Sequence, residues 1–253
     1  MVENQKQEFK FPTETIDLPS KGKVYSSDSP LASGKIEIKY MTAKDEDILT
    51  SQNLIKKRIV IDKLLNSLIV TPGVNSDDLV IGDKNAVMVA VRILAYGGNY
   101  TAEVTHPNTG ETQQIEFDLT ACEFKEIPDD IDYSKDLELI LPVTKTNITF
   151  KILTGKDESE ILKETKSLQK IGQTAEMSTR LRKMITSVNG DSEKSTINAF
   201  VETMLSKESL FLREEVARIN PDIDLSQEID MGGEVVSVAI PMTTEFFWPK
   251  AGA

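Results

Sequence analysis

Short stretches in which apolar and polar residues alternate recur along the chain, and they predict β-strands. The clearest is Lys35–Tyr40, which is apolar on one face and charged on the other. Two later pairs of strands flank strong turn residues, at 106–110 and at 231–233, and therefore predict β-hairpins. The predicted strands are residues 16–18, 35–40, 100–105, 113–119, 137–141, 147–153, 223–229 and 235–240.

Apolar residues at helical spacing predict helices between these strands. Thr42, followed by Asp45 three residues later, fits a capping box and predicts that a helix starts there. The segment 84–95 is apolar nearly all round, which is typical of a helix buried in the centre of a domain. The other predicted helices cover residues 61–69, 181–188, 197–205 and 207–219. Together the patterns predict an α+β fold.

The two halves of the chain share their order of elements and some of their residues. Residues 36–46 align with 148–158, with identities at Ile36, Lys39, Thr42, Lys44, Asp45 and Glu46. Gly110-Glu111 and Gly233-Glu234 occupy the same corner of each terminal hairpin. We interpret this as a degenerate internal duplication of one unit: a short N-terminal β-hairpin, a helical cluster and a terminal β-hairpin. Two unrelated α+β halves remain the alternative.

The predicted organisation follows from this repeat. Residues 1–15 are polar and unpatterned, and we expect a flexible N-terminal arm. Residues 16–127 form the first predicted α+β half and residues 128–253 the second, with the acidic loop Pro128–Asp132 as the linker.

Net charge and composition limit the cellular compartments and the classes of partner that are expected for this chain. The formal net charge is 29 − 41 = −12, which argues against general affinity for nucleic acid, because Lys and Arg dominate such binding. The sequence has no apolar run of about 20 residues, so no membrane helix is expected. The first six residues lack the apolar stretch of a signal peptide, and the one cysteine, Cys122, excludes an internal disulfide framework. We expect a reducing cytoplasm.

Candidate chemistry is sparse. One histidine, His106, and one cysteine cannot build a closed Cys/His zinc site, which needs four such ligands. His106 is expected to be an exposed turn residue and Cys122 a small, half-buried apolar one. A calcium-loop-like stretch from Asp222 fails at Gln227 and Gly233, where glycine and glutamate are required. We predict no catalytic residue, no metal and no cofactor.

Two segments are candidate partner-binding surfaces. Near the C-terminus, Phe246, Phe247 and Trp248 are either interface anchors or a cap on the second half's own core. The stretch 18–25 is either a structural corner or a docking loop. Its candidate residues are Leu18, Pro19, Lys21 and Tyr25.

The stretches 18–25, 34–51 and 54–65 resemble the baseplate hub subunits and hub assembly proteins of T4-like myoviruses. The resemblance extends to residues 246–249, and its specific part is the first ninety residues. It implies a late viral protein in the host cytoplasm that binds other phage tail or baseplate proteins without covalent chemistry. Whether the chain is a hub subunit or an assembly catalyst, and whether it stays in the virion, is left open.

Two further questions stay open at this stage. The alternative function is a tail-carried hydrolase whose paired carboxylates are brought together by the fold. Self-association into a homo-oligomer is the other open question, since no feature of the sequence decides it.

Overall fold

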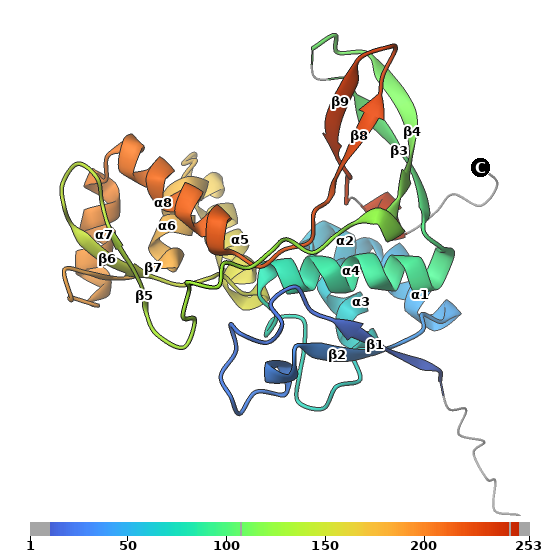
Figure 1. Cartoon of the computed structure of the whole chain (residues 1–253), viewed down its shortest axis with the longest axis horizontal. Coiled ribbons are helices and arrows are strands. Elements are labelled where there is room, and N and C mark those ends of the chain that lie inside the picture. Colours follow the sequence, from blue (N-terminus) through green and yellow to red (C-terminus); the bar gives the residue numbers. More distant parts are fainter. Residues whose placement is uncertain (1–10, 107, 243, 248–253) are drawn as a thin grey trace, which may run out of the picture.

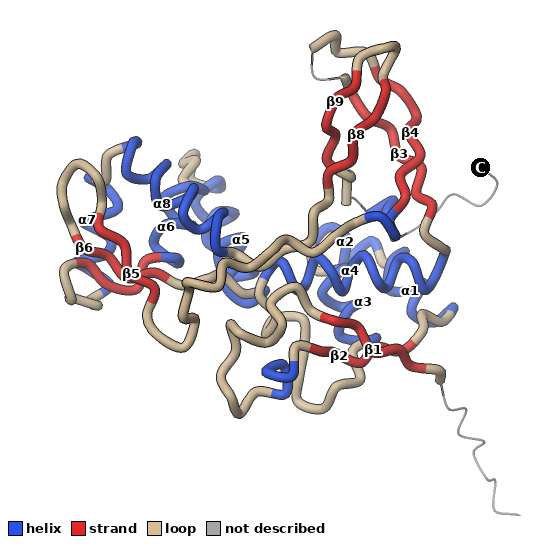
Figure 2. Tube along the Cα trace, viewed as in Figure 1, coloured by secondary structure: helices blue, strands red, loops and turns tan. Residues whose placement is uncertain are grey.

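The computed structural model describes residues 11–106, 108–242 and 244–247. Helices and small antiparallel sheets build it, which confirms the predicted α+β class. Figure 1 shows a helical layer with a small β-hairpin beneath it, an arm of β-hairpins projecting from that layer, and a second helical unit to one side. Figure 2 shows that extended loops, not regular structure, join the second unit to the rest.

The first part of the chain packs a hairpin against four helices. β1 pairs with β2 in an antiparallel register that sets Thr13 opposite Lys39. Thr13 to Thr15, predicted to belong to a flexible arm, therefore lie in a strand; residues 1–10 lie outside the described residues. These elements are β1 (Thr13–Asp17), β2 (Lys35–Lys39), α1 (Ala43–Thr50), α2 (Gln52–Lys57), α3 (Val60–Leu68) and α4 (Ile81–Tyr96), with the 3-10 turn η1 (Pro30–Ser33) between the strands.

Two antiparallel hairpins form the projecting arm, as the turn residues predict. The inward residues of β3 and β4, among them Tyr100 and Phe117, are buried, and their neighbours in sequence are exposed. Gln227 links the two hairpins by exchanging hydrogen bonds with the backbone of Asp118. The arm comprises β3 (Asn99–Thr105), β4 (Thr112–Asp118), β8 (Ser226–Asp230) and β9 (Val235–Ala239), with the 3-10 turns η2 (Leu119–Ala121) and η3 (Thr244–Phe247) near its base.

The second unit holds a three-stranded sheet in the order β5-β6-β7 and four helices. The helix predicted over 181–188 is wrong in its second half, because Ile185–Val188 is strand β7 and pairs with β6. Ile185 and Val188 are three residues apart, a spacing that a helix and a short buried strand both permit. The elements are β5 (Leu137–Ile140), β6 (Asn147–Phe150), α5 (Gly155–Lys170), α6 (Glu176–Met184), β7 (Ile185–Val188), α7 (Lys194–Thr203) and α8 (Ser206–Ile219).

The hydrophobic core is divided differently from the predicted halves. One buried cluster combines residues between Leu18 and Leu119 with residues between Ile223 and Phe247. The second cluster runs from Leu141 to Ile219. The terminal hairpin β8–β9 thus packs on β3–β4 and not on the helices that precede it, so the predicted boundary at residue 128 does not separate the two cores.

Two connecting segments run antiparallel between the clusters. The backbone N–H of Lys125 donates to the carbonyl of Asp222 (2.8 Å), and the N–H of Asp224 donates to the carbonyl of Glu123 (2.7 Å). Gly82 lies against this crossing, where a Cβ would stand 1.7 Å from the carbonyl oxygen of Pro221. Only glycine allows an approach this close.

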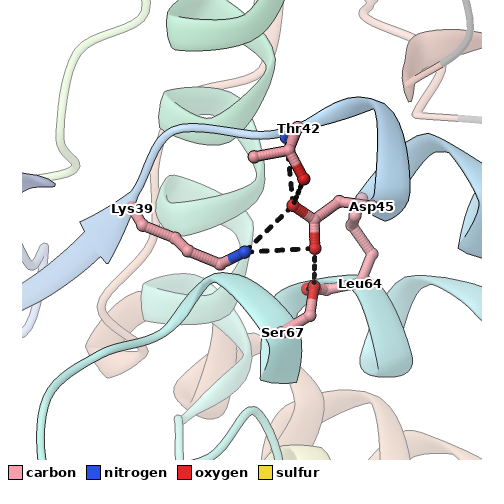
Figure 3. A network of polar contacts seen from close by, with 5 residues as sticks. All are labelled: Lys39, Thr42, Asp45, Leu64 and Ser67. Atoms are coloured by element: carbon pink, nitrogen blue, oxygen red, sulfur yellow. Dashed lines mark hydrogen bonds and ion pairs between the residues drawn. The ribbon is translucent and has the colours of Figure 1, made fainter. Parts of the chain in front are cut away.

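One polar network occurs twice, at the starts of α1 and α5. In Figure 3, Asp45 accepts from Thr42 Oγ1 (2.6 Å), Lys39 Nζ (3.0 Å) and Ser67 Oγ (2.8 Å). Asp157 likewise accepts from Thr154 Oγ1 (3.0 Å) and Lys151 Nζ (2.6 Å). The same hydrogen bonds, from lysine and threonine to aspartate, therefore occur at both helix starts. The aligned pairs are Lys39/Lys151, Thr42/Thr154 and Asp45/Asp157.

Candidate interaction surfaces

The arm is an acidic surface without lysine or arginine. Its strands and tips carry seven carboxylates, and the sequence contains no Lys or Arg between residues 93 and 124 or between 219 and 249. All seven of these side chains are exposed. They are Glu103, Glu111, Glu116, Asp118, Glu228, Asp230 and Glu234.

The register of the hairpins keeps these charges from facing one another directly. Glu103 lies opposite Gln114, Glu116 opposite Thr101, and Glu228 opposite Ser237. Directly opposed like charges would destabilise a strand pair, and this register avoids them. The arm therefore presents negative charge outward while its inner faces stay apolar.

The stretch 18–25 forms a corner that is closed around a buried carboxylate. Asp83, in the first turn of α4 and fully buried, accepts from the Ser20 N–H (2.8 Å), Ser20 Oγ (2.6 Å) and Tyr25 Oη (2.6 Å). Burial raises the pKa of Asp83, although these donors oppose that shift, and burial together with the Asp83 charge raises the pKa of Tyr25. Leu18 and Pro19 are buried, and Lys21 is exposed. The contacts are those of a structural corner, and partner binding there stays a prediction.

The aromatic residues near the C-terminus are buried at the base of the arm. Phe246 is 0% exposed, and its ring centroid lies 5.0 Å from that of Tyr100 and 5.0 Å from that of Phe247, both edge-on. The core they complete is the first cluster, not that of the predicted second half. Trp248 lies outside the described residues. Partner binding by this segment also stays a prediction.

Comparison with known protein families identifies the family of the chain. The sequence profile of the family described as T4 bacteriophage base plate protein matches residues 11–248. The chain belongs to this family. Membership of the base plate family indicates a role in the structure or assembly of a phage base plate, and a place in the virion tail. No curated protein and no solved structure matched the chain.

His106 of this base plate family member is not the exposed turn residue that the sequence suggests. It is 3% exposed, and its Nδ1 accepts from the N–H groups of Asn108 (3.1 Å) and Thr109 (3.3 Å). Its Nε2 lies 3.6 Å from a carboxylate oxygen of Glu234, on the other hairpin. His106 thus joins the tips of the two hairpins, a contact between residues too distant in sequence for a local pattern to reveal.

The other candidate chemical groups are held in unreactive surroundings. Burial raises the pKa of the Cys122 thiol, which lowers the fraction of thiolate, the reactive form. Among the described residues, no three His, Cys, Asp or Glu side chains are grouped so as to hold a metal ion. Within the same residues, no helix has both the length and the apolar character needed to cross a membrane.

Sequence reasoning missed the acidic arm, although its signal is visible in the sequence. The seven carboxylates are spread over two segments more than one hundred residues apart, and neither segment contains a charge run. Both segments can be identified in the sequence, because each contains a predicted hairpin and lacks Lys and Arg. Their assembly into one arm depends on the packing of β8–β9 against β3–β4, which only the structure reveals.

Proposed function

We propose that this chain is a non-enzymatic protein–protein interaction factor in the assembly of the base plate hub of a contractile phage tail. It acts either as an assembly catalyst or chaperone or as a hub subunit. Within the host cytoplasm it binds other tail and base plate proteins. The observation that carries this proposal is the acidic arm: an exposed two-hairpin projection with seven carboxylates and no Lys or Arg.

The arm has the physical properties of a docking element. Its two hairpins are held together by an apolar inner face and by the paired hydrogen bonds of Gln227, so little ordering entropy is lost on binding. A surface of one charge sign steers an oppositely charged partner and increases the association rate. The partner surface that fits the arm is therefore basic.

Co-sedimentation of the purified chain with base plate intermediates tests this role of the arm. Glu103, Glu111 and Glu228 form no side-chain hydrogen bond or ion pair with another described residue, so changing all three to Gln removes charge without removing a contact. Binding is expected to weaken both in this variant and in high salt. The matched control changes Glu138, Glu202 and Glu214, exposed on the second unit, to Gln. Equal binding by both variants would contradict the role of the arm.

The alternative of a tail-carried hydrolase draws on one observation, the raised pKa of Asp83, because glycosidases use a carboxylic acid with a raised pKa. Asp83 is fully buried and accepts hydrogen bonds from three donors, which favours a structural role. A Cys122→Ala variant is expected to leave assembly intact. Loss of function in this variant, with the fold retained, would support chemistry.

We also propose that the chain arose by internal duplication. The aligned residues Lys39, Thr42 and Asp45 and their counterparts Lys151, Thr154 and Asp157 form equivalent networks at equivalent strand-to-helix junctions. The terminal hairpins of the two units then pack on each other in the arm. Duplication accounts for both features, and it places the sheet and helices of the second copy, residues 137–219, between the two paired hairpins in sequence.

The choice between subunit and catalyst depends on the finished particle. Quantitative mass spectrometry of purified virions measures the copy number of the chain relative to the hub proteins. A copy number near theirs identifies a subunit, and absence from the particle identifies a catalyst.

A further inference from the structure

A basic cleft lies between the first helical layer and α5 of the second unit. Its volume is about 400 Å³, and six of its fourteen lining residues are basic. They are Lys57, Arg58, Lys63, Lys84, Lys163 and Lys166. On a chain whose net charge is −12, this is a local reversal of sign.

Most of this positive charge is not neutralised inside the cleft. Three acidic residues line it, but Asp62 pairs with Lys84, and Glu158 pairs with Arg180, which lies outside this cleft. That leaves Asp77 against five cations. Among the described residues, none of these five forms an ion pair. Lys163 and Lys166 are one helical turn apart on α5, where like charges destabilise a helix slightly.

Arg58, which also lines the cleft, adds a second local cost. It ends α2 with φ +58°, the left-handed conformation that glycine adopts most easily. The side chain is exposed. Arg58 thus combines a strained backbone conformation with a positive charge. Residues in strained backbone conformations cluster at functional sites.

The lining of the cleft also includes apolar residues. Ile59 and Leu162 provide apolar surface. A smaller cavity of about 110 Å³ adjoins the cleft and shares four lining residues with it: Arg58, Glu158, Leu162 and Lys166. Thr165 lines this smaller cavity at 6% exposure, and its hydroxyl has no hydrogen-bond partner among the described residues. A buried hydroxyl without a partner is costly, so a ligand that supplies one gains affinity.

We propose that this cleft binds an acidic peptide segment of a partner protein, with carboxylates on the lysines and one apolar side chain against Ile59 and Leu162. The inference rests on the proposed function as an interaction factor, and it adds a surface opposite in charge to the arm. A cleft of this size suits a few residues of peptide. Nucleic acid fits less well, because the acidic surroundings repel a long polyanion.

Fluorescence anisotropy of a labelled heptapeptide, six glutamates around a central leucine, tests the proposal with the purified full chain alone. We expect saturable binding that weakens about tenfold in K163E/K166E. The control K194E/K207E changes the net charge equally at exposed sites on the second unit and is expected to stay within about twofold of the wild type. R58G is expected to weaken binding without lowering Tm, because glycine relieves the left-handed strain.

Several results would overturn this assignment. The first is equal binding by K163E/K166E and the wild type, and the second is an equal loss in the control. Tighter binding of an oligothymidylate that is lost in the same variant would assign the cleft to nucleic acid. A dimer in sedimentation that the heptapeptide disrupts would assign it to a second copy. Because no base plate component is present, a negative result here leaves the test of the arm unaffected.

Discussion

Replacing Phe246 by alanine removes a fully buried ring from the base of the arm. Truncation of a core phenylalanine costs about 3–5 kcal/mol, of which each edge-on contact, with Tyr100 and with Phe247, accounts for about 0.5–1.5 kcal/mol. A domain's free energy of unfolding is about 5–15 kcal/mol, so this single change removes a large share of it. Phe11, which is 53% exposed, is the control, and its alanine variant is expected to cost only about 0.5–1 kcal/mol, for the cation–π contact of Lys39 Nζ, 5.2 Å from its ring centroid.

The location of the damage is as informative as its size. Hydrogen exchange followed peptide by peptide is expected to accelerate in β3–β4 and β8–β9, because these hairpins share the first cluster with Phe246. Exchange in α5 to α8, which pack around the second cluster, is expected to stay unchanged. Two results would refute the assignment of the C-terminal segment to the first core. One is a loss of less than about 1 kcal/mol in the free energy of unfolding, and the other is hydrogen exchange that accelerates in α5–α8 before it does in the hairpins.

Two further predictions concern the capping networks and the crossing of the linkers. Burial acts to raise the pKa of Asp45 and Asp157, but hydrogen bonds from threonine and lysine outweigh it and leave both pKa values lowered. The two carboxylates therefore stabilise the fold above the ordinary aspartate pKa of about 4, and this stabilisation is lost as pH falls through their folded-state pKa values. In urea unfolding measured against pH, D45N/D157N should reduce the fall of the free energy of unfolding at acidic pH. An unchanged fall would contradict the role of these carboxylates. Gly82→Ala should destabilise the chain by about 3 kcal/mol or more, because its Cβ would meet the Pro221 backbone. Gly73→Ala, at φ +75° with open space around it, should cost only about 1 kcal/mol, so equal melting temperatures for the two variants would rule out the close approach.

The local elements could be predicted from the sequence because their causes are local. Thr42 and Asp45 give the start of α1, and the alternation around Tyr100 gives the buried face of β3. The sequence pattern assigns residues 185–188 to a helix because Ile185 and Val188 have helical spacing, which a short strand buried on both faces also permits. The pairing of β7 with β6 decides between the two. The hairpin β8–β9 was recognised, but the core it joins depends on contacts more than one hundred residues apart, which no local period encodes.

The candidate surfaces divide in the same way. Aromatic residues near the C-terminus and a turn such as the stretch 18–25 are typical both of interfaces and of cores. Whether their side chains are buried distinguishes the two, and burial is known only from the fold. Phe246 and Phe247 are buried in the core, and Tyr25 holds the corner through Asp83. The acidic arm and the basic cleft each combine distant segments, so their charge becomes visible only when those segments are brought together.

The yield of base plates in infected cells tests whether the arm is the docking surface of a base plate protein without chemistry of its own. Phage lacking the chain would be complemented with E103Q/E111Q/E228Q or with the control E138Q/E202Q/E214Q, and completed base plates counted after sedimentation. We predict about a tenfold lower yield with the arm variant and a wild-type yield with the control, at equal Tm and expression. A wild-type yield with the arm variant would show that the arm is not the docking surface.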